Sequence, residues 1–250
     1  NQAVNEDAAL GGSGYVVPSN TFSDTEGTAC TYTSTQTDGS ALPSWLTFTA
    51  GTRTYSGTPL NANVGALNVR TTCTDGSSAA VNDDFTITVT NTNDVPTSTS
   101  FTVTTAEDTE HVFTANEFGY ADVDSGDALI SAVLQAASAG TLWVDDGGGG
   151  GTADDGVVNG DEAAVADDDV VTAAELAKLS WDPAANANGA SYATFTYTLY
   201  DGDGYSSSYT ATLTVTAVND APTSAAVTVA NAEDTLITYT TANFAFTDSD

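Results

Sequence analysis

The sequence predicts an all-β protein made of antiparallel Greek-key sandwiches arranged end to end. Short runs alternate apolar residues with threonine, as in Phe85-Thr-Ile-Thr-Val-Thr90. This period of two puts the apolar side chains on one face of a strand. Turn-forming steps such as Asp38-Gly39 and Asp75-Gly76 separate the runs. Helical periodicity is almost absent, and many short strands bury their apolar faces most readily in a sandwich.

A repeated tetrapeptide divides the chain. Asn-Asp-Val-Pro at 93–96 returns as Asn-Asp-Ala-Pro at 219–222, and each copy closes an alternating run. We therefore expect a first repeat at 1–95, a second at 96–221 and the start of a third at 222–250. So short a third piece holds at most two strands and buries no core alone, so we expect the natural chain to continue.

The elements can be placed in order. In the first repeat, strands are expected around 30–33, 45–48, 67–69 and 85–90. In the second, they are expected around 101–105, 129–135, 142–144, 195–200 and 209–218. Thr172 followed by Glu175 has the spacing of a capping box. One or two helical turns are therefore expected at 172–178.

The charge of the chain is extreme. Its 250 residues carry 34 acidic side chains against three basic ones, giving a net charge of −31 with 40% hydrophobic content. Such a surface excludes nucleic acid and disfavours anionic membranes as partners. The self-repulsion needs counter-ions, which divalent cations or high environmental salt could provide. No run of 18 apolar residues occurs, so we expect no membrane insertion of this segment.

Acidic residues recur at fixed distances from the tetrapeptide. An Asp-Gly step precedes each Asn by 18 residues, a Glu-Asp pair follows it by 14, and an Asp-x-Asp begins 15 beyond that Glu. Calcium prefers six to eight oxygen ligands from carboxylates, amides and backbone carbonyls. The repeated spacing therefore predicts calcium-binding joints between the repeats. The alternative is a simple turn at Asn-Asp-x-Pro with a solvated acidic surface.

Three segments of the first repeat carry a family resemblance. Leu42-Pro-Ser-Trp-Leu-Thr-Phe48, Arg53-Thr-Tyr-Ser-Gly-Thr-Pro59 and the motif at 93–96 resemble the dystroglycan-type cadherin-like module. The second repeat resembles the cadherin-like tandem repeats of bacterial surface proteins and adhesins. It does so through Glu107-Asp108, Phe118-Gly-Tyr-Ala-Asp-Val-Asp124, Asp182-Pro-Ala-Ala-Asn-Ala-Asn-Gly189 and the motif at 219–222.

The resemblance implies a calcium ligand set at each junction. At the first junction the set is Glu6, Asp7, Asp75, Asn93, Asp94, Asp122 and Asp124. At the second it is Glu107, Asp108, Asp201, Asn219, Asp220, Asp248 and Asp250, with Asp203 as an addition. Asp24 and Glu26 would face a preceding domain. In this interpretation each Glu-Asp pair serves the junction at the far end of its own repeat.

The second repeat contains an acidic, glycine-rich insertion at 145–170. Asp155-Gly-Val-Val-Asn159 with Glu162 fits the later positions of an EF-hand-like loop, but Gly151 and Ala153 occupy the first ligand positions. We therefore favour an exposed flexible loop and keep a calcium loop as the alternative.

Two cysteines occur, both in the first repeat. Cys30 and Cys73 each fall on the apolar side of an alternating run. In Ig-like sandwiches such positions face each other across the core, so we expect a disulfide there. Closing so long a loop stabilises the fold by roughly 4 kcal/mol on the chain-entropy estimate. Two buried thiols in a reducing compartment are the alternative.

Catalytic signals are weak, so we expect no enzyme. His111 has no nucleophile motif near it, and Trp45, Trp143 and Trp181 lie in strand patterns that favour the core over a sugar platform. We expect a calcium-stiffened stalk or fibre segment of an extracellular surface adhesin, with neighbouring repeats as its partners. One alternative is a segment that copies of the chain assemble into a filament. The other is a module that binds a glycan or a protein.

Overall fold

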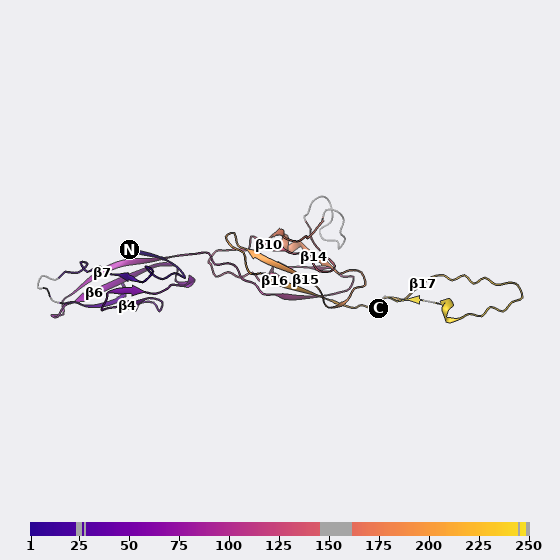
Figure 1. Cartoon of the computed structure of the whole chain (residues 1–250), viewed down its shortest axis with the longest axis horizontal. Coiled ribbons are helices and arrows are strands. Elements are labelled where there is room, and N and C mark those ends of the chain that lie inside the picture. Colours follow the sequence, from indigo (N-terminus) through magenta and orange to yellow (C-terminus); the bar gives the residue numbers. More distant parts are fainter. Residues whose placement is uncertain (24–26, 28, 146–161, 245, 249–250) are drawn as a thin grey trace. The chain divides into compact units, whose positions relative to one another are not determined.

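The chain folds into two compact β-rich units in the computed structural model (Figure 1). The structure describes residues 1–23, 27, 29–145, 162–244 and 246–248. The first unit comprises Asn1–Asp94 with Val123–Ser125, and the second comprises Val95–Asp122 with Gly126–Asp250. The divisions at 95 and 221 that the repeated motif suggested remain predictions about independent domains.

The first unit is a sandwich of two sheets. One sheet has the order β1-β7-β6-β3, with β1 at Gln2–Asn5, β7 at Ala80–Thr90, β6 at Gly65–Thr74 and β3 at Thr31–Gln36. The other has the order β2-β5-β4, with β2 at Tyr15–Val16, β5 at Thr54–Ser56 and β4 at Thr47–Thr49. The pairs are antiparallel except for β1 and β7, which run parallel.

The core of this unit follows the predicted alternation. In β7, Phe85, Ile87 and Val89 are buried while Thr88 and Thr90 are exposed. Tyr55 of the facing sheet is fully buried, and its hydroxyl lies 2.8 Å from the Thr71 hydroxyl of β6. The period of two therefore predicts which side chains the two sheets bury.

The predicted disulfide is confirmed, but its place in the fold was expected incorrectly. Cys30 and Cys73 are bonded, with their Cα atoms 5.3 Å apart. Tyr32 lies opposite Cys73 in the β3–β6 register, so Cys30 precedes a strand that is the immediate neighbour of β6. The bond thus joins adjacent strands of one sheet and does not cross the core.

The second unit is a larger sandwich. Its first sheet has the order β13-β10-β15-β16-β8, with β13 at Asp169–Thr172, β10 at Ser131–Leu134, β15 at Gly189–Tyr200, β16 at Tyr209–Thr216 and β8 at Phe101–Ala106. Its second has the order β12-β11-β14-β9, with β12 at Glu162–Ala164, β11 at Thr141–Asp145, β14 at Leu179–Asp182 and β9 at His111–Val112. Again only the outermost pair of the long sheet, β8 and β16, is parallel among these pairings.

The described part of the insertion at 145–170 is more ordered than expected. It contains β12 and the first half of β13, and Val165 between them is buried. The EF-hand-like positions at 151–159 lie outside the described residues. Thr172 and Glu175 exchange the two hydrogen bonds of the expected capping box, since the Thr172 N–H donates to the Glu175 carboxylate and the Glu175 N–H donates to the Thr172 hydroxyl at 3.3 Å. The short helix η3 at Glu175–Lys178, however, has Ala174 as its N-cap.

The described residues after 222 form few regular elements. They contain β17 at Thr223–Ser224, β18 at Phe246–Thr247 and a short helix η4 at Thr241–Phe244. Apolar side chains stay exposed there, with Leu236 88% exposed. The segment agrees with the expectation that a piece of this size holds at most two strands.

Candidate metal centre

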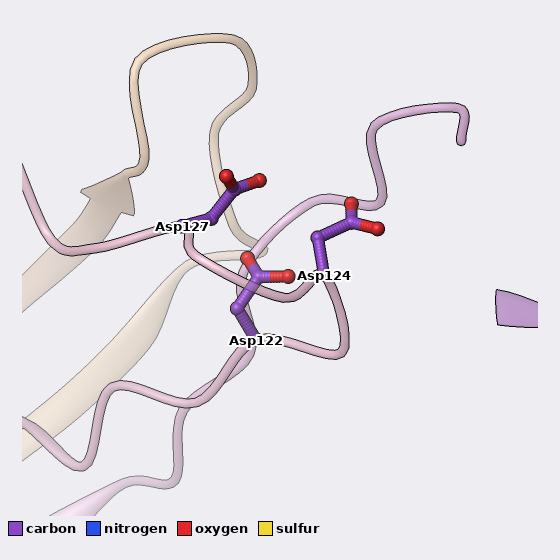
Figure 2. A group of neighbouring side chains, drawn as sticks. All are labelled: Asp122, Asp124 and Asp127. Atoms are coloured by element: carbon purple, nitrogen blue, oxygen red, sulfur yellow. The ribbon is translucent and has the colours of Figure 1, made fainter. Parts of the chain in front are cut away.

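Three carboxylates gather on the loop at 122–127. Asp122, Asp124 and Asp127 each offer an oxygen atom within 4.8 Å of the others, and Figure 2 shows the three side chains on this one short loop. Asp122 and Asp124 were predicted from the repeated spacing, whereas Asp127 was missed. The full pattern Asp-x-Asp-x-x-Asp within one loop is the signal that could have found it.

Asp124 also holds the backbone that ends the first unit. It is 5% exposed, and its Oδ2 accepts a hydrogen bond from the Asp94 backbone N–H at 2.6 Å. Its Oδ1 accepts one from the side-chain amide of Asn61 at 2.5 Å. Asn61 begins the short helix η1 at Asn61–Asn63. It was not predicted, because it has no counterpart in the repeated acidic spacing.

Glu6, near the start of the first unit's sequence, contacts the backbone that follows β7 near the end of that sequence. The parallel pairing of β1 with β7 places Asn5 opposite Thr90, so Glu6 comes next to the residues that leave the sheet. The Glu6 side chain is 3% exposed, and its Oε1 accepts a hydrogen bond from the Thr92 backbone N–H at 2.8 Å. Its Oε2 is buried and has no hydrogen-bond partner among the described residues.

Glu107 repeats this arrangement in the second unit. It is 4% exposed, its Oε1 accepts a hydrogen bond from the Val218 backbone N–H at 2.5 Å, and its own N–H donates to Thr216 at 2.9 Å. Glu6 and Glu107 thus each contact the backbone just beyond the last strand of their own unit, which agrees with the predicted placement. The role of these glutamates as metal ligands remains a prediction.

The aspartates of the Glu-Asp pairs share an unusual backbone conformation. Asp7, Asp108 and Asp234 have φ angles of 56°, 55° and 58°. Aspartate tolerates this left-handed region better than most residues. The Asn residues of the tetrapeptides also match, because the Asn93 and Asn219 side-chain amides donate to the next carbonyl at 2.9 and 2.7 Å. The repeated sequence thus produces the same local geometry each time.

Asp75 lies away from the linker to which the spacing assigned it. β6 and β7 pair antiparallel from Gly65–Val89 to Thr74–Ala80, so Asp75 sits in the turn at the opposite end of the sheet from Thr90. At about 3.4 Å per residue, roughly 30 Å separates the two ends. The Asp75 carboxylate accepts hydrogen bonds from the Ser77 and Ala79 backbones, both at 2.8 Å. We therefore remove Asp75 from the first ligand set.

Asp201, like Asp75, lies away from the linker to which the spacing assigned it. The residues around it show which carboxylates it lies near. It follows β15 at the end far from Val218, and its Oδ1 accepts hydrogen bonds from the Asp203 and Gly204 backbones, both at 2.7 Å. Burial raises the pKa of Tyr120 to about 12, and the charges of Asp122, Asp201 and Asp127 add to this rise. Asp201 therefore groups with the carboxylates of the 122–127 loop and not with Asn219.

The remaining predicted residues are less closely grouped. Glu107, Asp220 and Asp248 form no three-carboxylate cluster among the described residues. Asp24, Glu26 and Asp250 lie outside the described residues. Of the first predicted set, the structure places Asp122 and Asp124 on one loop and hydrogen-bonds Asp124 to the Asp94 backbone.

The expected structural roles of other polar and aromatic residues can be checked. His111 lies 3.2 Å from Glu117, which also accepts hydrogen bonds from Thr114. Trp143 and Trp181 are fully buried, and Trp181 belongs to the core of the second unit. The expectation that these tryptophans are core residues is confirmed. Among the described residues, no helix is long and apolar enough to cross a membrane.

Comparisons with known proteins gave one family model and several similar structures. A family model described as "Putative Ig domain" matches residues 9–90. No curated protein sequence matches the chain. Human mucin-like protocadherin EC1-2 is 16% identical with a TM-score of 0.46, over 87% of this chain and 95% of that one. Human CDH23 EC21-23 is 14% identical with a TM-score of 0.49, over 100% of this chain and 84% of that one.

A hydrolase is also among the similar structures. Endo-fucoidan hydrolase MfFcnA4 from glycoside hydrolase family 107 is 18% identical with a TM-score of 0.29. The match covers 77% of this chain and only 24% of the hydrolase. At these identities and TM-scores, neither this likeness nor those to the cadherins transfers an activity to the chain. The Ig-like sandwich itself is shown by the sheets described above.

Proposed function

We propose that the chain is a calcium-stiffened structural segment of an extracellular surface adhesin. The observation that carries the proposal is Glu6, a buried carboxylate with one oxygen on the Thr92 N–H and the other without a partner among the described residues. A buried charge is costly unless it is paired or bound to a metal. Glu6 therefore fits a cation ligand at the linker better than a solvated surface acid.

The neighbouring residues provide the oxygen ligands that calcium prefers. Glu6, Asp94 and Asp124 would hold the ion, with Asp122, Asp127 and Asp201 as further carboxylates near the 122–127 loop. All of these side chains would bind the ion through carboxylate oxygen atoms, and none offers the thiolate or imidazole that zinc favours. When bound, the ion supplies positive charge that offsets the repulsion among these acids. Glu6 and Asp124 themselves hold the backbone N–H groups of Thr92 and Asp94, and so fix the linker.

Stiffening follows from linkage. An ion that binds the ordered linker better than the disordered one stabilises the ordered form. The same logic applies to Glu107 and the linker after Val218, with Asp220 and Asp248 as proposed further ligands. Pro96 and Pro222 restrict the backbone just beyond each set. A chain of such joints would act as a stalk that projects a binding tip from the cell surface.

The disulfide supports the extracellular location. Disulfides persist in oxidising environments and are rare in the cytosol, and Cys30 and Cys73 are bonded. The resemblance to bacterial cadherin-like repeats supports the adhesin assignment. An exposed glycan platform at Trp143 or Trp181 has no support, because both side chains are fully buried.

Small-angle scattering and calorimetry of the whole chain test the proposal. We expect millimolar calcium to raise the melting temperature and narrow the distribution of interunit distances, and EDTA to reverse both effects. A matched sample in EDTA with molar sodium chloride separates ion binding from charge screening. Scattering and melting that do not respond to calcium, or that respond equally to salt, would overturn the proposal.

A further inference from the structure

One side of the first sandwich is open. β3 and β4 are edge strands of their respective sheets, and an open groove of about 600 Å³ has residues of both strands in its lining. Its lining includes Tyr32, Ser34, Leu42, Phe48 and Ala50, without a charged residue. Leu42 and Phe48 are partly buried and pack against the core of the unit. The groove is therefore a place where the hydrophobic core reaches the surface.

The second unit closes the same side with two strands. Its strands β10, β15, β16 and β8 pair in the same order and directions as β3, β6, β7 and β1. In the second unit, however, β13 pairs with the outer edge of β10, and β12 pairs with β11 of the other sheet. Val165 and Val171 of this segment are 8% and 4% exposed. The position that β13 occupies beside β10 has no strand beside β3 in the described part of the first unit.

The difference arises from the insertion. Four residues, 50–53, connect β4 to β5, whereas residues 146–178 connect β11 to β14. The first unit therefore lacks the segment that supplies closing strands in the second. In the described part of the first unit, side chains such as Phe48 and Leu42 cover the core under this side.

β3 is suited to accept another strand. Thr37 donates its N–H to Asn68 of β6, and antiparallel pairing alternates between bonded and non-bonded positions. The backbone N–H and C=O groups of Tyr32 and Ser34 thus point away from β6, toward the groove. β3 carries no charge and no proline, and its register with β6 is unbroken over six pairs. Proteins usually protect edge strands with charged residues, prolines, bulges or covering segments.

We propose that this groove binds an extended peptide segment of a partner protein, which adds to β3 as an antiparallel strand. The second unit gives the side-chain pattern. Val171 of β13 lies opposite Ala132 and is buried. Ala132 pairs with Leu199, two residues before Asp201, just as Tyr32 pairs with Cys73, two residues before Asp75. The bound peptide therefore places a β-branched apolar residue opposite Tyr32.

Charge selects the kind of peptide. The chain carries a net charge of −31, so it attracts cationic segments and repels a second copy of itself. The groove lining is uncharged, which lets the backbone of a peptide approach β3. Asp38 lies in the turn after β3, at the end where an antiparallel peptide would begin. The partner segment is thus extended, alternately apolar, and basic near its N-terminal end.

Fluorescence anisotropy with the whole chain tests this assignment. The probe is a labelled eleven-residue peptide of alternating valine and threonine, with two lysines at each end. A second probe has proline at the central valine and loses a backbone donor. A third has glutamate in place of lysine. We expect the proline and glutamate probes to bind at least tenfold more weakly than the first, with or without calcium.

A pair of variants tests the location. Ala50→Lys puts bulk and positive charge at the groove, whereas Ala79→Lys makes the same charge change in the β6–β7 turn. We expect Ala50→Lys to weaken binding at least fivefold and Ala79→Lys to have little effect. Amide hydrogen exchange at 31–36 should slow when the peptide binds. Equal effects of the two variants, or unchanged exchange at 31–36, would show non-specific attraction and overturn the proposal.

Self-association gives a further decisive outcome. Slower exchange at 31–36 with rising chain concentration and no peptide would show that a second copy occupies the groove, which contradicts the heterologous partner. Because the binding does not require calcium, its failure leaves the proposed joints untouched. Conversely, a chain insensitive to EDTA could still bind the peptide.

Discussion

Replacing Glu6 with Gln separates a metal ligand from a structural hydrogen bond. Gln is nearly isosteric, and its Oε1 can still accept the hydrogen bond that Glu6 takes from Thr92 at 2.8 Å. What changes is the second oxygen, which is buried and has no partner among the described residues. An amide in that position carries no charge and is a poorer partner for a cation. The substitution therefore acts mainly on the charge.

The expected effect depends on calcium. At a calcium concentration 100 times Kd, binding stabilises the ordered form by about 2.7 kcal/mol. Losing one charged ligand should weaken binding at least tenfold, or about 1.4 kcal/mol. For a unit of this size that is roughly 5–10 °C of melting temperature. In EDTA, the variant should melt no lower than the parent chain, because an unpaired buried charge has been removed.

Differential scanning calorimetry in millimolar calcium and in EDTA measures the melting temperature of each chain with and without the ion. Asp83→Asn is the matched control, since it makes the same charge change in β7 well before the linker. We expect its effect on melting to be equal in the two buffers. If Glu6→Gln lowers the melting temperature equally in calcium and in EDTA, then Glu6 acts only through its hydrogen bond and the metal-ligand argument fails.

Three further predictions use the same chain. Asp75→Ala should leave the calcium-dependent rise in melting temperature unchanged while costing about 1 kcal/mol of unfolding free energy through lost turn hydrogen bonds; a loss of the calcium response would restore Asp75 to the ligand set. Reducing the Cys30–Cys73 disulfide should destabilise the first unit by up to about 4 kcal/mol, measured by urea unfolding with and without reductant. Burial raises the pKa of Tyr55 above its ordinary value of 10.0. The stability that the neutral Tyr55 hydroxyl contributes to the fold is therefore full below pH 10 and is lost as the pH rises through the raised pKa. Tyr55→Phe should flatten this alkaline loss in a pH series of melting curves, and an unchanged profile would contradict it.

Periodicity was sufficient to predict the fold because the two sheets bury alternate residues. The run at 85–90 reads directly as a strand whose Phe85, Ile87 and Val89 enter the core. What the pattern did not contain was strand order. The disulfide was expected across the core, but β3 and β6 are neighbours in one sheet, because hydrophobic alternation specifies a face and carries no information about lateral neighbours.

The sequence likewise predicted the positions of some candidate site residues and not of others. Glu6 and Glu107 lie at the predicted end of their units because each directly follows a strand that runs parallel to the last strand of its unit. Asp75 and Asp201 were misplaced because a fixed distance along the chain does not say which end of an antiparallel pair a residue occupies. An 18-residue separation across a hairpin turn returns the chain to the opposite end of the sheet from that turn.

The repeated and unrepeated parts of the sequence serve different regions of the fold. Residues at constant spacing lie at the ends of the units, where Glu6 and Glu107 hold the backbone beyond the last strand. The insertion at 145–170 has no counterpart in the first unit, and its described strands lie on the side of the second sandwich. The proposed joints therefore depend on residues at the ends of each unit, while the sides of the two units differ. On that argument a binding property specific to the first unit belongs at the open side at β3, since altering that side changes no residue of the proposed joints.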